Sequence, residues 1–483
     1  MREVKHSETK SAGRLDPSAQ LRTMILLEMP WGRDKDPRVP LGHASLLASL
    51  RKLGRGEVIS IVAPVNDIST SPDRLRRRIM GIARKSYSVD LAIGAYVWSE
   101  EVLRELLTQL RDSGFDGRII LGGPQISYSP SGLEDLYPEA DVFVRGYGEM
   151  ALVALFNDPN ERSIEGVHFA GGEDTNSQTI VDLSVLPSPW INGDIELKDQ
   201  GFVRWESQRG CAFSCSFCQH KEAGKRLNRR ELDEDRVMSE IDLFCESGVS
   251  DIAVLDPIFN MGKLSKKILR RLIEKGYDGR ISLQCRAESC DEEFLELCSR
   301  LHTRLEFGLQ TIHRDEGRAV NRTNNMRFVE KWFGRIKELQ IEFEVSIIFG
   351  LPEQTLESFR KTVSWCLKMG VPVIKAFPLM LLRGTEVEQR KSEWGLIESN
   401  GSMPVVIKSE TFRHSDWLEM SRLSEALKET EGNHPPSIHT LSETASKLEI
   451  REERFRPEKS LDSEEVLNMK TSKRACSVKE VGA

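Results

Sequence analysis

The sequence lacks the features of a secreted or membrane-embedded protein. No apolar run approaches the ~20 residues that a helix needs to span a bilayer, and the charged, polar stretch from Met1 to Ala19 is unlike a signal peptide. The first 210 residues contain no cysteine, and the nine cysteines that follow do not have the spacing of a disulfide framework. These absences predict a cytoplasmic protein with no membrane span.

The chain also has little excess of either charge. Its 68 basic and 75 acidic residues leave a formal net charge of −7, which argues against a general nucleic-acid binder. Short basic runs at 74–78 and 225–230 are typical of solvated helix or loop faces. No internal repeat of solenoid period is present, and the length of 483 residues predicts about three domains.

Three of the cysteines fall within eight residues, directly after a glycine: they are Cys211, Cys215 and Cys218. Iron–sulfur clusters normally take four cysteines, so a site with three leaves one iron open to an outside ligand. Zinc would instead require a fourth tetrahedral ligand, which His220 or Cys245 could supply. Ligand count favours the cluster over zinc.

The spacing C-x3-C-x2-C, with the aromatic Phe217 before the last cysteine, resembles the cluster loop of radical S-adenosylmethionine (SAM) enzymes. The resemblance implies a [4Fe–4S] cluster on Cys211, Cys215 and Cys218, with SAM chelating the open iron through its amino and carboxylate groups. It also implies that an electron from the cluster cleaves SAM to a 5′-deoxyadenosyl radical. Such an enzyme needs an external electron donor such as flavodoxin or ferredoxin.

Short apolar strands alternate with amphipathic helices from residue 21 onward, as in a parallel sheet covered on both faces. We expect strands at 24–28, 58–62, 90–96, 118–121 and 142–145, and helices at 41–53, 72–85 and 100–113. Five glycines follow or end these strands: Gly94, Gly122, Gly123, Gly146 and Gly148. Because open α/β sheets bind ligands at the carboxyl ends of their strands, these glycines predict a cleft.

Segments 39–50, 121–124 and 144–149 are similar to the cobalamin-binding-type domain that precedes the barrel in one branch of radical SAM enzymes. The resemblance spans residues 21–165 and implies a Rossmann-like, doubly wound sheet whose glycines approach a cobalamin closely. The chain departs from that branch at Tyr147, where glutamate is frequent, and it has no D-x-H-x-x-G loop. The sequence therefore lacks the motif that supplies a histidine as lower ligand to cobalt. His43 is a candidate for that ligand only because it is a histidine.

A second series of strands and helices begins at the strand before the cysteines. We expect strands at 202–205, 251–255, 281–285, 304–308, 343–349 and 373–377, and helices at 232–245, 263–275, 292–300, 325–339 and 355–369. Six strands with crossover helices predict a partial (β/α)6 barrel, which the resemblance also implies. Both arguments place one site at the carboxyl ends of the strands.

The resemblance further implies SAM contacts at these strand ends, namely Asp256, Glu288, Gln310, Gly350 and Leu351. Asp256 would lie beside the methionyl amine, Glu288 would contact the ribose or the amine, and Gly350 with Leu351 would lie against adenine. Glu288 or Arg286 could instead form an ion pair at the barrel rim.

The sixth strand leads to an end similar to the L-P-G-T of many barrels in this branch, with Arg383 in place of proline. Its guanidinium could reach a carboxylate or phosphate on the substrate, or could only cap the strand end.

These patterns divide the chain into six segments. They are a disordered tail at 1–20, a cobalamin-binding-type Rossmann-like domain at 21–165, a linker at 166–200, a radical SAM partial barrel at 201–398, a barrel-closing C-terminal segment at 399–436, and a disordered tail at 437–483.

The first functional hypothesis is a cobalamin-dependent C-methyltransferase that acts on a small molecule or natural-product intermediate. The alternative is a cobalamin-free radical SAM dehydratase, epimerase or cyclase whose first domain is vestigial. A binding module stabilised by zinc or a cluster is a third hypothesis, which the six-strand barrel disfavours. A tRNA methylthiotransferase would need a further cysteine set in the first domain, so the absence of cysteine before residue 211 excludes it.

Overall fold

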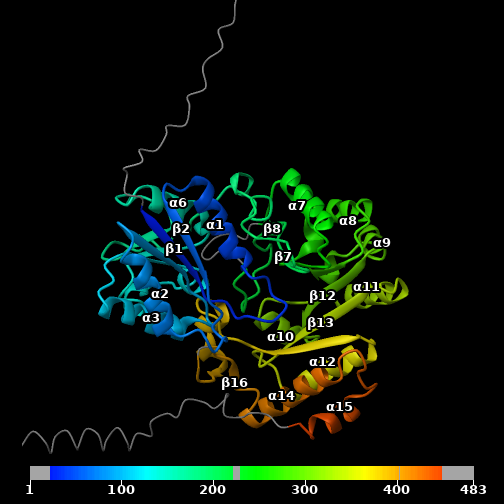
Figure 1. Cartoon of the computed structure of the whole chain (residues 1–483). Helices are drawn as coiled ribbons and strands as arrows, with labels where there is room; N and C mark the ends of the chain where they lie inside the picture. Colours follow the sequence, from blue (N-terminus) through cyan, green and yellow to red (C-terminus); the bar gives the residue numbers. More distant parts are fainter. Residues whose placement is uncertain (1–21, 221–228, 402, 449–483) are drawn as a thin grey trace, which may run out of the picture.

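The computed structural model describes residues 22–220, 229–401 and 403–448. Two six-stranded sheets, each flanked by helices, lie beside one another, with the N-terminal sheet in blue and cyan and the second in green to yellow (Figure 1). The expected tail at 1–20 lies outside the described residues. Every strand and helix predicted for the two series is present, with ends within two residues of the predicted ones.

The first sheet has the strand order β2-β1-β3-β4-β5-β6. Its strands are β1 (Thr23–Glu28), β2 (Glu57–Val62), β3 (Val89–Gly94), β4 (Arg118–Gly122), β5 (Val142–Val144) and β6 (Val167–Phe169). The first five are parallel, and β6 is antiparallel to β5. The predicted linker therefore starts too early, because β6 belongs to this sheet and Thr179 continues it through a bridge to Gly146.

Successive side chains of β1 point to opposite faces of the first sheet, and each face packs against its own apolar layer. Met24 and Leu26 pack with α1 (Leu41–Leu53) and α6 (Gly148–Asn157) on one face. Ile25 and Leu27 pack with α2 (Pro72–Ala83) and α3 (Glu100–Asp112) on the other. The sequence did not predict α6, because its apolar residues occupy most sides of the helix and give no amphipathic period.

The second sheet is a partial barrel with the order β14-β13-β12-β11-β10-β7. Its strands are β7 (Phe202–Trp205), β10 (Asp251–Val254), β11 (Arg280–Cys285), β12 (His302–Gln310), β13 (Glu342–Phe349) and β14 (Val373–Pro378). All neighbouring pairs are parallel, and β7 and β14 remain at opposite edges. The covering helices are α7 (Glu234–Glu246), α8 (Ser265–Glu274), α9 (Glu292–Cys298), α11 (Met326–Glu338) and α12 (Leu356–Lys368). The predicted fold class is thus confirmed.

The C-terminal segment contains a small hairpin, β15 (Ile397–Glu398) with β16 (Val406–Lys408), and α14 (His414–Glu429), which packs on β14. The prediction of a disordered tail from residue 437 is wrong for its first part, because α15 (Ile438–Ala445) packs on α14. Ser437 caps this helix by accepting a hydrogen bond from the Thr440 N–H, and Leu441 is fully buried. Residues 449–483 lie outside the described part.

None of the helices in the described residues is both long enough and apolar enough to cross a membrane.

Candidate active site

The five predicted glycines come together on one cavity of about 290 Å³ at the carboxyl ends of β1, β3, β4 and β5. We call it the glycine cavity. It is lined by Gly94, Gly122, Gly123, Gly146 and Gly148 together with apolar side chains of the strands and of α1 and α6, among them Leu26, Ala92, Ile120, Val144, Leu46 and Leu152. The cavity therefore combines an apolar interior with bare backbone at the strand ends.

Glycine is required at several of these positions by space or by backbone angle. A Cβ on Gly94 would lie 2.7 Å from Oε2 of Glu28, and one on Gly123 would lie 2.9 Å from the carbonyl oxygen of Ala95. Gly123 and Gly146 also have φ angles of +91° and +81°, which residues with a side chain rarely adopt. The glycines thus permit sharp turns that keep the cavity open.

His43 does not line the glycine cavity. Its side chain is buried on α1, where Nε2 lies 2.7 Å from the Ser60 hydroxyl. Burial lowers the pKa of His43 to about 4, so the imidazole is neutral at pH 7. The histidine is part of the packing between α1 and β2.

A second cavity, of about 390 Å³, is lined by Cys211, Cys215 and Cys218 and by residues at the strand ends of the barrel. We call it the cysteine cavity. The cysteine loop is fixed on both sides, because Ser216 N–H donates to the Val320 carbonyl at 2.9 Å and its own carbonyl accepts from Val387 N–H at 3.1 Å. The Asn321 amide also donates to the Ser214 hydroxyl at 2.6 Å. The three thiols are therefore held on one wall.

Two arginines face the thiols across this cavity. Burial raises the pKa of Cys215, while Arg322 and Arg286 oppose that rise. Arg286 also lies over the Phe213 ring, 3.9 Å from its centroid, which fixes the guanidinium beside the loop. The two arginines thus offset part of the effect of burial on Cys215 and favour an anionic group that enters the cavity.

The described cysteines form no disulfide, and no three His, Cys, Asp or Glu side chains in the described residues gather closely enough to hold a single metal ion. His220 lines the cysteine cavity, but Cys245 lies on α7 and does not. Cys285 also touches the cavity, although it packs within the core cluster of the barrel. The three loop thiols line one cavity, and His220 is the one candidate fourth zinc ligand that lines it with them.

Of the five predicted SAM contacts, Gln310 is the one that lines the cysteine cavity. It ends β12 with a φ angle of +66°, and its Oε1 is buried without a hydrogen-bond partner in the described residues. A buried polar atom without a partner is unfavourable, so this amide oxygen is available to a ligand hydroxyl or amine.

Asp256 has a different role from the predicted one. Its carboxylate is fully buried and accepts hydrogen bonds from Ser207 N–H at 2.7 Å, Gln208 N–H at 3.1 Å and the Ser207 hydroxyl at 2.5 Å. Burial raises the pKa of Asp256 to about 7, and these hydrogen bonds limit the rise. Asp256 thus fixes the turn that leads from β7 to the cysteine loop.

Glu288 forms the rim ion pair that was the alternative interpretation. Its Oε2 lies 3.2 Å from Nε of Arg286, and its Oε1 accepts from Asn325 N–H at 3.0 Å. Glu288 does not line the cavity, whereas Arg286 does. The glutamate therefore orients the arginine that faces the thiols.

Gly350 and Leu351 also lie away from the cavity. The Gly350 N–H donates to Oε1 of Gln354 at 2.7 Å, and a Cβ on Gly350 would lie 3.2 Å from the Val406 carbonyl of β16. Leu351 is fully buried in the barrel core. The hairpin that follows the barrel covers this turn, and for that reason the expected adenine contact is not supported.

Sequence reasoning missed the charged residues that face the interior of the barrel. Glu306, Glu344 and Lys375 line the cysteine cavity from β12, β13 and β14, and the Lys375 ammonium lies 2.8 Å from Oε1 of Glu344. Burial raises the pKa of Glu306, with the neighbouring Glu344 adding to the effect. The alternation of polar and apolar residues in β12 and β13 was the signal that could have located them.

A third cavity, of about 290 Å³, joins the other two, and we call it the middle cavity. It shares Gly123, Gly146, Tyr147, Glu206, Arg209 and Leu255 with the glycine cavity, and His220 and Pro257 with the cysteine cavity. Tyr128 and Gln219 complete the wall, and the Tyr128 hydroxyl donates to the Gln219 carbonyl. The middle cavity therefore lies between the glycine cavity and the cysteine cavity and shares wall residues with each of them.

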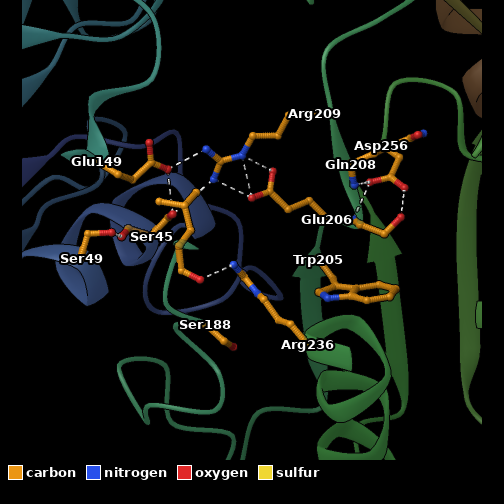
Figure 2. A network of polar contacts seen from close by, with 12 residues as sticks. Ser45, Ser49, Glu149, Ser188, Trp205, Glu206, Gln208, Arg209, Arg236 and Asp256 are labelled. Atoms are coloured by element: carbon orange, nitrogen blue, oxygen red, sulfur yellow. Dashed lines mark hydrogen bonds and ion pairs between the residues drawn. The ribbon is translucent and has the colours of Figure 1, made fainter. Parts of the chain in front are cut away.

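Arg209, two residues before Cys211, connects the two sheets. Figure 2 shows its guanidinium between Glu149 of α6 and Glu206, with N–O distances of 2.7 Å and 2.8 Å, and 3.2 Å from the Ser45 hydroxyl of α1. Burial acts to raise the pKa of the Glu149 carboxyl. The effect of Arg209 is opposite and stronger, so the pKa of Glu149 lies below its usual value. The network is buried, since 12% of the Arg209 side chain and 5% of the Glu149 side chain are exposed.

Arg383 makes a second connection between the two sheets, and neither predicted role applies to it. Its guanidinium pairs with Glu100 of α3 at 2.7 Å and donates to the Gln125 carbonyl and the Tyr137 hydroxyl, each at 3.1 Å. The carbonyl of Arg383 accepts from the Gln219 amide at 2.8 Å. Through this ion pair and these hydrogen bonds, Arg383 connects the end of the barrel and the cysteine loop to the first domain.

Residues 205–366 match the family model described as the Radical SAM superfamily. This segment is a radical SAM domain. The match runs from the end of β7 into α12 and includes the cysteine loop, as the sequence resemblance implied.

Relatives with this domain are similar over more of the chain. The cobalamin-dependent radical SAM methyltransferase TokK of Streptomyces tokunonensis is 23% identical over 65% of this chain and 48% of its own length. The 2-(S-pantetheinyl)-carbapenam-3-carboxylate methyltransferase of Streptantibioticus cattleyicolor is 25% identical over 58% of this chain and 45% of its own length. The chain thus spans about half the length of these curated relatives.

The solved structure of the radical SAM methyltransferase TsrM from Kitasatospora setae, with cobalamin and a [4Fe–4S] cluster bound, has a TM-score of 0.64 to this chain. The likeness covers 82% of this chain and 81% of TsrM at 18% identity. It shows that both sheets of this chain have the fold of TsrM, and the expected fold of the first domain is confirmed at that level.

The contact of Arg209 with Glu149 generates a stability prediction. We expect Glu149→Gln to lower the free energy of unfolding at pH 7.5 by roughly 1.5–3 kcal/mol, the usual contribution of a hydrogen bond to a charged group. Because the pKa of Glu149 is lowered in the folded state, its stabilisation is present above the unfolded pKa and is lost as the pH falls through the folded pKa. The difference between variant and parent should therefore shrink on acidification.

Urea unfolding followed by circular dichroism at pH 7.5 and at pH 4 measures both effects. Glu101→Gln, an exposed change on α3, is the matched control and should leave the midpoint unchanged. An unfolding midpoint of Glu149→Gln equal to that of the parent at pH 7.5 would contradict the prediction.

Proposed function

We propose that this chain is a cobalamin-dependent radical SAM C-methyltransferase that acts on a small molecule. The observation that carries the proposal is the adjacency of three cavities, in which the middle cavity shares wall residues with both the glycine cavity and the cysteine cavity. A methyl carrier and a radical source must both reach one substrate carbon, and a shared middle cavity meets that requirement.

The residues of the cysteine cavity fit a [4Fe–4S] cluster and SAM. Cys211, Cys215 and Cys218 would hold three irons, and the positive wall of Arg286 and Arg322 would stabilise the anionic thiolates and the methionyl carboxylate. The unpaired Oε1 of Gln310 would accept a hydrogen bond from a ribose hydroxyl. These roles use side chains that the cavity already presents.

The residues of the glycine cavity fit cobalamin. The apolar interior between the sheet and α1 and α6 would take the nucleotide tail, and the bare backbone at the five glycines would allow the corrin ring to approach. Among the described residues that line this cavity there is no histidine, so none of them would offer an imidazole to cobalt.

When bound, the cluster would supply the electron that cleaves SAM reductively, and cobalamin would carry the transferred methyl group. The chain's own residues would place the substrate: Arg209 and Glu206 form a paired, charged wall of the middle cavity, and Tyr128 and Tyr147 line it with rings. Arg383 keeps the two domains together, which limits the entry of water. The reacting carbon would thus be held between the two cofactor sites.

The names of the relatives support a small-molecule substrate, since one is described as acting on a pantetheinylated carbapenam carboxylate. The reductant is an external electron donor such as flavodoxin or ferredoxin.

The cluster assignment predicts the effect of cysteine replacement. We expect Cys211→Ala, Cys215→Ala and Cys218→Ala each to abolish the [4Fe–4S] centre after anaerobic reconstitution, because three irons then lack one of their thiolates. Iron and sulfide analysis with EPR of the reduced protein measures the centre. Cys245→Ala is the control and should retain the parent's iron content, because Cys245 lies outside the cavity.

Iron content that survives the triple replacement would contradict this assignment. So would stoichiometric zinc in protein purified without oxygen, particularly if Cys245→Ala released it.

The methyltransferase assignment predicts two products from SAM. One molecule supplies the methyl group and leaves S-adenosylhomocysteine, and a second is cleaved reductively and leaves 5′-deoxyadenosine, so both should accumulate together. The protein should be loaded with cobalamin, freed of excess, reduced, and assayed by liquid chromatography and mass spectrometry with candidate substrates.

A cobalamin-free dehydratase, epimerase or cyclase would give a different result. Release of 5′-deoxyadenosine without S-adenosylhomocysteine, in protein that fails to retain cobalamin, would overturn the methyltransferase and favour that alternative.

A further inference from the structure

Glu28 is a buried carboxyl group on the wall of the glycine cavity. It ends β1, its residue is 5% exposed, and it lines the cavity together with Tyr96, which follows β3. A Cβ on Gly94 would lie 2.7 Å from Oε2 of Glu28 and 2.8 Å from Cε2 of Tyr96. Both side chains therefore rest over the bare backbone of Gly94, and the pair faces the space that a ligand would fill.

Glu28 has no cation beside it. Arg209 is the one basic side chain among the described residues that line the glycine cavity, and it is engaged by Glu149 and Glu206. On α1, His43 is directed to Ser60. Other charged side chains of the adjoining elements lie in contacts away from Glu28: Arg51 of α1 with Asp194, and Asp90 of β3 with Arg22 and Arg118. Tyr96 is thus the polar neighbour that Glu28 has inside the cavity.

A carboxylate without a cation is unfavourable in such a place, because burial penalises the charged form. Burial raises the pKa of Glu28 to about 8, and a hydrogen bond with Tyr96 opposes part of that rise. At neutral pH the group is therefore mainly a carboxylic acid, which has an O–H to donate, and it becomes an acceptor alone as the pH rises through the pKa.

We propose that Glu28 donates a hydrogen bond from its protonated carboxyl to an uncharged acceptor of the corrinoid, an amide carbonyl or a ribose hydroxyl, and so makes corrinoid binding sensitive to alkaline pH. The inference rests on the proposed function, since it requires a corrinoid in the glycine cavity. Tyr96 is a positioning residue that holds the carboxyl toward the ligand. The acceptor is uncharged, because no basic side chain on the wall of the glycine cavity is free to pair with an anionic acceptor.

Binding of methylcobalamin to the full-length apoprotein in the dark tests the assignment, by equilibrium dialysis with absorbance readout between pH 6 and pH 9.5. The parent should bind with constant affinity up to about pH 7.5 and should then weaken about tenfold per pH unit above the pKa of Glu28. Glu28→Gln keeps an N–H donor that does not titrate, so its affinity should stay constant over the whole range.

Two more variants complete the test. Glu28→Ala should bind at least tenfold more weakly at pH 7 and without the alkaline loss, and Glu101→Gln on α3 should follow the parent at every pH. Methylcobinamide, which lacks the nucleotide tail, distinguishes the two acceptor sources. An equal effect of Glu28→Ala on both ligands would place the acceptor on the corrin amides, and an effect on methylcobalamin alone would place it on the nucleotide.

An alkaline loss of affinity in Glu28→Gln equal to that of the parent would overturn the role of Glu28, as would parental affinity in Glu28→Ala. Circular dichroism confirms that each variant is folded. If the folded parent retains no corrinoid at any pH, the proposed function itself fails, and this outcome differs from a parent that binds without dependence on Glu28.

Discussion

The buried contact of Arg209 with Glu149 and Glu206 is the interaction on which the rest of the site depends. Arg209 is two residues from Cys211, and Glu149 lies in the first turn of α6, which begins at Gly148. One guanidinium therefore sets the position of the cysteine loop relative to the glycine cavity (Figure 2). Removing it would leave two buried carboxylates without a counter-ion, which is strongly unfavourable.

Arg383 forms a second ion pair of the same kind, away from the lining of the middle cavity. Both arginines come from the barrel and pair with glutamates of the first domain, so the two sheets are joined at two separated points. Two such contacts restrict rotation as well as separation of the domains. The distance between the glycine cavity and the thiols is thus set by the protein, and does not depend on what the cavities contain.

The regular helices and strands were predictable because they depend on local periodicity in the sequence. The cysteines and glycines of the site were predictable because metal-cluster chemistry and backbone angles restrict the residue type at those positions. The roles of Asp256 and Arg383 were not predictable, because each depends on a partner distant in sequence, Ser207 and Glu100. The ion pair of Glu288 was one of two interpretations, since its partner Arg286 is only two residues away. Helix α6 was not predicted because it is apolar on most sides and shows no amphipathic period. Helix α15 was not predicted because it is a short helix in a charged segment, and its stability comes from packing on α14. Tertiary contacts decided these features, and a local pattern does not contain them.

The glycine cavity also bears on whether the first domain is vestigial. Holding Glu28 protonated at pH 7 costs on the order of 3 kcal/mol relative to an exposed carboxyl, given a pKa of about 8. A domain that served only to support the barrel would be more stable with an apolar residue at position 28. The chain instead keeps an apolar cavity, an unpaired acid on its wall and positive-φ glycines at its mouth. A bound ligand that uses the space and the carboxyl would offset these unfavourable features, which is a physical reason to prefer a cobalamin-binding domain over a vestigial one.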